Sequence, residues 1–424
     1  MGSREKMKTK FKDTEIGMIP EGWNVEVFSN VIAINPKRAI KKGTTARKIS
    51  MQNLIEFKRT IDGFELSEFK GGSKFQNEDT LMARITPCLE NGKTAYVDLL
   101  EDNEIAFGST EFIVLSGKDN LTRNDFVYYL AISPKIRRIA IQSMTGTSGR
   151  QRIQADLLGD VEIGIPSLSE QHRIAKILSN LDSKIELLQK QNKTLEAIGQ
   201  AIFKHWFVDF EFPNEEGKSY KSSGGEMVFN EELGKEIPKG WDVGKLGDII
   251  ENFDSKRIPL SSREREKRKG KFPYYGATKI MDYVDDYLFN GTYILMAEDG
   301  SVTDDGGYPV LQYVWGKFWV NNHAHIIKGK GISTEFLYVL LLRTKISEYV
   351  TGAVQPKLNQ TNMNSIKILI PDSLSVKSFD KLIQDMFIKQ KSLYEQIQSL
   401  QKIRDSLLPK LMSGKIRVPA EVRT

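Results

Sequence analysis

The chain has 424 residues, of which 40% are hydrophobic and 27% charged, so it is long enough for two to four domains and too apolar for a disordered protein. Sixty-one lysines and arginines outnumber 55 aspartates and glutamates, and the net charge of +6 permits a polyanionic partner without proving one. The single cysteine, Cys88, excludes an internal disulfide and favours a cytoplasmic protein. The sequence contains no uninterrupted apolar run long enough to predict a membrane span.

A motif near the start of the chain returns near its middle. Residues 19–25 read Ile-Pro-Glu-Gly-Trp-Asn-Val, and residues 237–243 read Ile-Pro-Lys-Gly-Trp-Asp-Val. Over the fourteen residues that each motif opens, six positions are identical, and residues 34–38 later resemble 253–257. Self-similarity at a fixed spacing predicts a tandem duplication of one structural unit.

The region that follows each motif has the pattern of a mixed α and β domain. Short apolar segments between turn residues predict strands at 111–115, 293–296 and 325–328. Apolar residues three and four apart predict helices at 125–141 and 335–350. We therefore expect an α+β fold in each half, with the strand order left open.

A long heptad pattern ends each half of the chain. The first follows Ser167 and Glu170, which form a capping-box pattern. Apolar residues then recur at alternating spacings of three and four, as on the seam of a coiled coil. The residues expected on this seam are Ile174, Leu178, Leu181, Ile185, Leu188, Leu195 and Ile202 in the first helix and Phe379, Ile383, Met386, Leu393, Ile397, Leu400, Leu407 and Leu411 in the second. Polar Asn192, Gln390 and Arg404 on the same seam would fix its register.

The two heptad patterns favour a fold in which two similar mixed α/β domains are separated by two long helices that form an antiparallel coiled coil. Two copies of one unit related by a twofold axis would run these helices in opposite directions. A 35-residue helix is about 50 Å long, so such a coil would act as a ruler between the domains. The alternative is two separate amphipathic helices, each packed on its own domain; five heptads exceed the usual length of such helices.

These patterns divide the chain into segments, of which the linker is rich in Gly, Ser, Lys and Glu. We expect a flexible N-terminal tail at 1–13, a first domain at 14–166, a central helix at 167–212, a linker at 213–234, a second domain at 235–371, a C-terminal helix at 372–413 and a tail at 414–424.

Catalytic motifs are not identifiable in the sequence. Residues 92–94, Gly-Lys-Thr, resemble the end of a phosphate-binding loop, but Pro87 stands where that loop needs a glycine and has no N–H to hold a phosphate. No Gly-x-Gly-x-x-Gly motif opens a strand-to-helix turn. We therefore expect no catalytic residue and no bound cofactor, so the chain is not expected to be an enzyme.

A histidine pair is the best candidate for a metal site. His323 and His325 lie two residues apart and would share one strand face, as paired ligands can. Because no cysteine or acidic ligand is identifiable beside them, hydrogen-bonded structural imidazoles are favoured and no metal is expected. The acidic turns at 298–300 and 304–306 are explained by the side-chain hydrogen bonds of Asp in turns.

Basic side chains cluster at corresponding places in the two halves. Residues 37–48 contain no acid. Basic loops with adjacent aromatic rings can neutralise phosphates and contact base edges. A solvated polar loop is the alternative, and the recurrence in both halves favours a nucleic-acid contact. The candidate DNA-binding residues are Lys37, Arg38, Lys41, Lys42, Arg47 and Lys48 in the first half and Lys256, Arg257, Arg263, Arg265, Lys269, Lys271, Tyr274 and Tyr275 in the second.

A second pair of loops follows a Thr-Gly step in each half, at 145–146 and 351–352. Arginine suits guanine and glutamine suits adenine in the major groove. Either loop could equally be a structural turn. The candidate DNA-binding residues in these loops are Arg150, Arg152, Gln355 and Lys357.

Together these motifs resemble the specificity subunits of type I restriction-modification enzymes. The resemblance covers residues 14–418, nearly the whole chain. The matching segments are the two Ile-Pro-x-Gly-Trp-x-Val motifs, Pro-Ser-Leu-Ser-Glu-Gln-His-Arg-Ile-Ala-Lys-Ile-Leu at 166–178, the pattern at 182–196, Ile-Phe-Lys-His-Trp-Phe-Val-Asp-Phe at 202–210, Phe-Pro-Tyr-Tyr-Gly-Ala at 272–277 and Asn-His-Ala-His at 322–325.

The resemblance implies a DNA-recognition subunit without catalytic activity. Each domain would be a target recognition domain that reads one half of an asymmetric, bipartite DNA sequence. The two helices would set the unread spacer and dock two modification (methyltransferase) subunits, which a translocating restriction subunit would join. S-adenosylmethionine, ATP and magnesium would then belong to these partners.

Three other functions stay open from the sequence. The chain could be a stand-alone DNA-modifying enzyme, although the catalytic motifs for this are missing. It could also be a coiled-coil scaffold without a nucleic-acid partner, or a coiled-coil DNA-binding scaffold outside restriction-modification.

Overall fold

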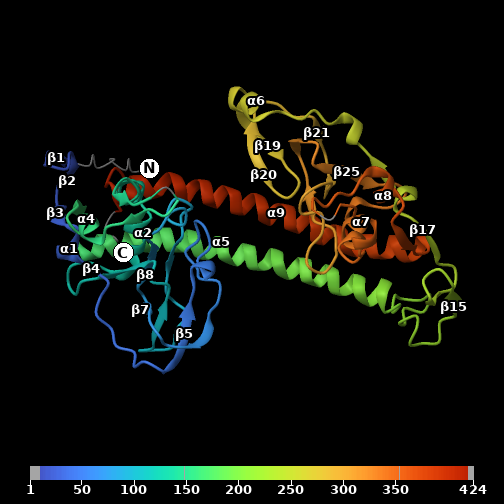
Figure 1. Ribbon diagram of the computed structural model, residues 1–424, viewed down its shortest axis with the longest axis horizontal. Coiled ribbons are helices and arrows are strands. Elements are labelled where there is room, and N and C mark those ends of the chain that lie inside the picture. Colours follow the sequence, from blue (N-terminus) through green and yellow to red (C-terminus); the bar gives the residue numbers. More distant parts are fainter. Residues whose placement is uncertain (1–9, 148, 353, 419–424) are drawn as a thin grey trace, which may run out of the picture. The chain divides into compact units, whose positions relative to one another are not determined.

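The computed structural model describes residues 10–147, 149–352 and 354–418. The tails expected at 1–13 and 414–424 therefore lie partly outside the described residues. The chain divides into two compact units (Figure 1). Unit 1 contains the residues up to Leu188 and those from Gln396 onward, and unit 2 contains Gln189–Glu395.

Unit 1 is built on two four-stranded sheets. In the first sheet, of order β4-β11-β8-β9, all neighbouring strands are antiparallel. In the second, of order β6-β5-β10-β7, the central strands β5 and β10 run parallel and the outer pairs antiparallel. The strands are β4 (Ile32–Ile34), β11 (Phe112–Gly117), β8 (Thr80–Ala83), β9 (Thr94–Tyr96), β6 (Glu65–Glu68), β5 (Thr45–Ile49), β10 (Ile105–Gly108) and β7 (Ser73–Gln76).

Helices cover the first sheet of unit 1. Helix α2 (Asn124–Ala131) lies against β8, β9 and β11 (Figure 1). The single helix expected at 125–141 is wrong, because α2 ends and a separate helix, α3 (Pro134–Gln142), begins. Pro134 has no N–H to continue α2 and stands in the first turn of α3, whose N-cap is Ser133. Two shorter helices of this unit are α1 (Phe28–Val31) and α4 (Ala155–Gly159).

Unit 2 repeats the topology of unit 1. Its sheets have the orders β18-β25-β22-β23 and β20-β19-β24-β21, with parallel pairing again only between the central strands of the second sheet. The duplication expected from the sequence is thus present in the fold. The strands are β18 (Ile250–Asn252), β25 (Ala324–Gly329), β22 (Tyr293–Ala297), β23 (Leu311–Val314), β20 (Ile280–Val284), β19 (Lys269–Tyr275), β24 (Lys317–Val320) and β21 (Phe289–Asn290).

Helix α7 (Thr334–Leu341) takes the place of α2 against β22 and β25 (Figure 1). The helix expected at 335–350 is therefore too long, and a separate 3₁₀ turn follows at Ser347–Tyr349. Beyond α7, the N–H of Ile346, a fully buried residue, donates to the carbonyl of Gly307 and not to an earlier turn of the helix. Shorter helices of unit 2 are α6 (Ser262–Lys267) and α8 (Gln360–Asn364).

Small two-stranded sheets complete both units. Four of them form equivalent pairs in units 1 and 2, and the fifth, β12-β13, belongs to unit 1. Residues 213–234, expected as a linker, contain β15 and Tyr220, whose ring stacks on that of the preceding Phe212 with centroids 4.5 Å apart. The strands are β1 (Phe11–Lys12), β2 (Ile19–Pro20), β15 (Met227–Asn230), β16 (Lys235–Pro238), β3 (Asn24–Val27), β14 (Glu162–Ile165), β17 (Asp242–Lys245), β26 (Lys367–Ile370), β12 (Met144–Thr145) and β13 (Arg152–Ile153).

Two long helices each contribute residues to both units. Helix α5 (Leu168–Phe203) continues into a π-helical turn at Lys204–Val208, and helix α9 spans Ser373–Met412. Each apolar residue expected on the heptad seam is buried or half-buried. Among the described residues, no helix combines the length and the hydropathy needed to cross a membrane.

Within each unit, α5 and α9 run in opposite directions. In unit 1, Leu178 of α5 shares a core with Leu408 and Leu411 of α9, and Asp182 accepts a hydrogen bond from Arg404 at 2.9 Å. In unit 2, the ring centroids of Phe203 and Phe379 lie 5.6 Å apart, and the carbonyl of Asn192 accepts from Gln390 at 3.5 Å. In both places, later residues of α5 meet earlier residues of α9.

The N-terminal end of α5 departs from a full capping box. Ser167 accepts a hydrogen bond from the N–H of Glu170, but the Glu170 side chain does not return to Ser167. It is buried and accepts hydrogen bonds from Trp23 at 3.2 Å and from both ends of the Arg417 fork at 2.5 and 2.7 Å. The tryptophan of the repeated motif therefore anchors the start of a long helix. In unit 2, Trp241 donates in the same way to Asp372 at 3.0 Å.

Candidate nucleic-acid interface

The first basic segment of unit 1 presents three exposed lysines. Lys37, Lys41 and Lys42 stand between β4 and β5, and no acidic residue among those described forms an ion pair with them. Their ammonium groups are therefore available to an external anion. Phosphates of duplex DNA are anions that such lysines neutralise.

Arg38 of the same segment is committed to the protein itself. Its guanidinium reaches both carboxylate oxygens of the buried Asp79 at 2.6 Å. Burial raises the pKa of Asp79, although the N–H of Gln76 and the charge of Arg38 oppose this. Arg38 thus compensates a buried carboxylate, and this bond fixes the loop that carries Lys37.

Arg47 and Lys48 lie on β5 and are also paired. Arg47 contacts Glu101 at 2.8 Å and Lys48 contacts Glu65 at 2.6 Å. The segment lacks acids in the sequence, but the fold brings acids from other strands and loops beside it. Of the six candidate DNA-binding cations in this segment, Arg38, Arg47 and Lys48 are therefore ion-paired within the protein.

Unit 2 shows the same division between free and paired cations. Lys256, Arg263 and Lys271 are exposed, and no described acid pairs with them. Arg265 and Lys269 instead converge on Asp282, at 3.4 and 2.6 Å. In both units, unpaired exposed cations and ion-paired cations therefore stand in the same segment.

The two tyrosines expected to face DNA do not lie free on the surface. Tyr274 is 1% exposed, and its hydroxyl exchanges hydrogen bonds with the backbone of Leu260 at 2.9 and 3.3 Å. A base cannot stack on a ring in this position, so that prediction is wrong. Tyr275 is half-buried and packs edge-on against Phe318, and burial raises its pKa to about 12.

The second loops occupy matching positions in the two units. The carbonyl of Arg84 accepts from Ile153, just as that of Glu298 accepts from Leu358. Arg152 and Lys357, one residue earlier on these loops, therefore correspond. Arg150 and Gln355 are exposed, and no described residue binds their side chains, whereas Arg152 holds Glu111 at 2.7 Å and Lys357 lies 3.7 Å from Glu298.

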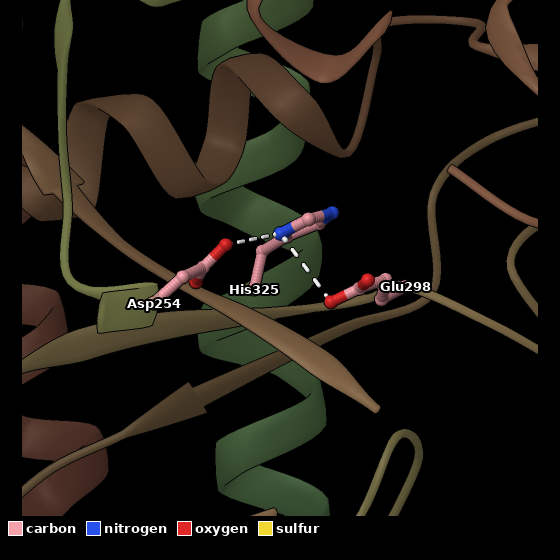
Figure 2. Close-up of side chains that lie close together, drawn as sticks. All are labelled: Asp254, Glu298 and His325. Atoms are coloured by element: carbon pink, nitrogen blue, oxygen red, sulfur yellow. Dashed lines mark hydrogen bonds and ion pairs between the residues drawn. The ribbon is translucent and has the colours of Figure 1, made fainter. Parts of the chain in front are cut away.

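A buried charge cluster holds the unit 2 loops together. Figure 2 shows Asp254, Glu298 and His325 around one point. The Nδ1 atom of His325 lies 2.6 Å from Asp254, and its Nε2 atom lies 2.7 Å from the carbonyl of Leu358. Arg257 donates to Glu298 at 2.7 Å and lies 3.6 Å from Asp254. The cluster therefore connects the basic segment at 254–257 to the loop that carries Gln355 and Lys357.

The hydrogen bonds assign a charge to this histidine. Both ring nitrogens of His325 face acceptors, so the imidazolium form satisfies both. Burial lowers the pKa of His325, but the hydrogen bond and charge of Asp254 outweigh it and raise the pKa above its usual value. Burial likewise raises the pKa of Asp254, and the bond and charge of His325 reverse this and lower it.

The same cluster has three of the residue types that bind metals. Coordination by His325 would require a ring nitrogen to give up one of its hydrogen bonds, and Arg257 already supplies a positive charge to both carboxylates. Its chemistry is thus that of an ion-pair network. His323, the other histidine of the expected pair, is exposed and contacts Asp299 at 2.8 Å instead.

A basic cleft in unit 1 contains residues that the sequence patterns did not single out. It has a volume of about 470 Å³ and brings Lys74 and Arg84 beside Lys37 and Arg38. Arg84 stands alone among apolar residues at the end of β8, so no local charge pattern marks it. Only the strand pairing, which places β8 next to β11, could have revealed it.

Comparisons with known proteins agree with this architecture. The family model of the Type I restriction modification DNA specificity domain matches residues 20–197 and again 238–404. The specificity subunit of the type I restriction enzyme MjaIX of Methanocaldococcus jannaschii is 29% identical over 97% of both chains. That of HindI of Haemophilus influenzae is 25% identical over 80% of this chain and 86% of its own.

A solved structure shares the fold. The S subunit of a type I restriction-modification system from M. genitalium has a TM-score of 0.55 and 20% identity, and the match covers 96% of this chain and 99% of that one. The two family matches start at equivalent positions of the duplicated units and together span most of the chain. The chain therefore belongs to the family of type I restriction-modification DNA specificity proteins.

Proposed function

We propose that the protein is the non-catalytic subunit that gives a type I restriction-modification complex its DNA sequence specificity. Each unit reads one half of an asymmetric, bipartite target. The observation that carries this proposal is the basic surface that recurs in both units. In each unit one arginine is fixed by an ion pair, and a neighbouring lysine is left without an acidic partner among the described residues. Lys37 directly precedes the paired Arg38 in unit 1, and Lys256 directly precedes the paired Arg257 in unit 2.

The long helices have a separate role in this proposal. They form an antiparallel coiled coil whose length sets the unread spacer between the two half-sites. Supporting this are the opposite helix directions and the buried seam residues within each unit. The outer helix faces dock two modification subunits, with which a restriction and translocation subunit associates. The cofactors of methylation and cleavage would belong to those partners.

Binding to duplex DNA at several salt concentrations tests the recognition role. The chain, assembled with its modification subunits, should bind with a log affinity that falls linearly with log salt. Lys37→Glu and Lys256→Glu should each weaken binding to every duplex and make this slope shallower. These lysines are preferable to Arg38 and Arg257, whose loss would also strand buried carboxylates. Equal affinity of wild type and both variants would contradict the assignment of these surfaces.

A paired deletion tests the ruler. Removing 183–189 from α5 and 396–402 from α9 shortens each helix by about 10 Å, the length of about three base pairs. The complex should then recognise the same two half-sites across a shorter spacer. Deleting only one segment breaks the seam register and serves as the control. Recognition of the original spacer by the doubly shortened protein would rule the ruler out.

A further inference from the structure

The basic cleft of unit 1 has an excess of positive charge. Of its four cations, Arg38 is paired with Asp79, and Lys74 donates to the Arg38 carbonyl at 3.2 Å. Lys37 has no ion-pair partner among the described residues. No acidic residue lines the cleft, so an acceptor-rich ligand would find uncompensated donors there.

Arg84 is a further cationic donor in this cleft. Its Nε atom is buried, and none of the described residues accepts a hydrogen bond from it. The nearest acid, Glu111, lies 3.8 Å away and already accepts two hydrogen bonds from Arg152 through one oxygen and a third through the other. The side chain is 38% exposed. Apart from this ion pair with Glu111, no described residue binds the Arg84 guanidinium, so its donors stay available.

The backbone of unit 2 identifies the residue that corresponds to Arg84. The N–H of Arg84 donates to Glu111 and its carbonyl accepts from Ile153. The N–H of Glu298 donates to His323 and its carbonyl accepts from Leu358 in the same arrangement. The next residue in each unit forms an isolated bridge to the equivalent loop. Glu298 therefore stands where Arg84 stands, with the opposite charge.

The opposite charges of Arg84 and Glu298 bear on the difference between phosphate contacts and base-edge contacts. The phosphate backbone is the same in every sequence, so two copies of one module should keep cations where phosphates lie. Lys37 and Lys256 follow this rule, and so do Arg152 and Lys357. Base edges differ between two unlike half-sites, so side chains that read them should differ between the copies. The change from Arg84 to Glu298 on an unchanged backbone fits a base-reading position.

Building on the proposed function, we propose that Arg84 determines specificity by binding a guanine edge in the half-site read by unit 1. An arginine fork donates two hydrogen bonds to the O6 and N7 acceptors of guanine in the major groove. Lys37 at the mouth of the same cleft neutralises an adjacent phosphate. At the corresponding position of unit 2, Glu298 is held by Arg257 at 2.7 Å, so no arginine fork stands there to bind a guanine.

The test uses the assembled complex and a set of duplexes with every single-base change across both half-sites. Arg84→Ala and Arg84→Lys should each lose about tenfold or more of the discrimination for one guanine in one half-site. Arg84→Lys keeps the charge, so its salt slope should stay that of wild type. Lys37→Ala, the control from the same cleft, should weaken all duplexes alike and reduce the slope by about one. Thermal melting of each variant checks its folding.

Two results would overturn this role. Arg84 variants that keep the guanine preference, or that weaken every duplex equally with a reduced salt slope, would show a structural or phosphate role. A wild-type complex without any sequence preference would contradict the proposed function itself. Failure of the proposed function can be distinguished from failure of the Arg84 role, because it is seen in the wild-type complex before any variant is compared.

Discussion

The two units share a backbone but differ at their centres. In unit 2, His325 lies between Asp254 and the carbonyl of Leu358 in a buried ionic network. In unit 1 the matching strand position is Ile113, and Asn35 takes over from Asp254 by accepting the hydrogen bond of the following strand residue, Val114. The backbone hydrogen bond is therefore kept in both units, whereas the charged Asp254 and His325 of unit 2 are replaced by the amide of Asn35 and the alkyl side chain of Ile113 in unit 1. A duplicated scaffold of this kind can therefore change what it reads without changing its fold.

The two units also differ in the polar residues of the helix pair, and this difference predicts the largest change in the free energy of unfolding. In unit 1 the seam contains the buried Asp182, bound by Arg404 at 2.9 Å and by Tyr129 at 2.8 Å. In unit 2 it contains the neutral Asn192 and Gln390. Arg404→Ala should cost about 3 kcal/mol or more in the free energy of unfolding, because it leaves the buried carboxylate with Tyr129 but without a charged partner.

Denaturant unfolding of the full chain measures this effect, with Gln390→Leu as the control from unit 2. That variant removes one long hydrogen bond and should change stability by less than about 1 kcal/mol. Similar losses in the two variants would mean that charge does not distinguish the two ends of the seam.

Substitutions at the hydrogen-bond partners of the two repeated tryptophans should lower the free energy of unfolding by smaller amounts than Arg404→Ala. Arg417→Ala removes both charged hydrogen bonds from the buried Glu170 and should destabilise unit 1 by about 2 kcal/mol. Ser375→Ala in unit 2 removes one hydroxyl from Asp372, which keeps Trp241 and two backbone donors, and should cost about 1 kcal/mol. Hydrogen exchange of peptides next to each tryptophan resolves the two effects, and the reverse order would contradict this account.

The smallest expected effect is a pH dependence confined to unit 2. The raised pKa of His325 stabilises the fold fully below its unfolded value, about 6.5, and this contribution is lost as pH rises through the folded value. The lowered pKa of Asp254 acts oppositely, since its contribution is lost as pH falls below about 3.8 and through the folded value.

Hydrogen exchange between pH 6 and 9, corrected for the intrinsic rate, should therefore show loosening around Leu358 with rising pH. The equivalent segment around Ile153 in unit 1 should show none. His325→Asn should abolish the difference, and the exposed His323→Gln serves as the control. Equal loosening of both segments would remove His325 as the cause.

Local patterns in the sequence predicted much of the fold and only part of the site. The duplication and the strands around residues 112, 293 and 325 follow from motif and apolar periodicity, which act over a few residues. The pairing of Arg38 with Asp79 joins residues far apart in sequence, so the charge run alone did not reveal it. The burial of Tyr274 and the equivalence of Arg84 and Glu298 depend on strand register, which local periodicity does not specify.

A map of modified bases in DNA exposed to the complex tests the central claim that each unit reads its own half-site. For wild type we expect two defined sequence elements separated by a fixed number of unspecified bases. In the Arg84→Ala protein one element should become degenerate at a single position, with the other element and the spacing intact. A continuous motif in wild type, or simultaneous changes in both elements of the variant, would contradict the account.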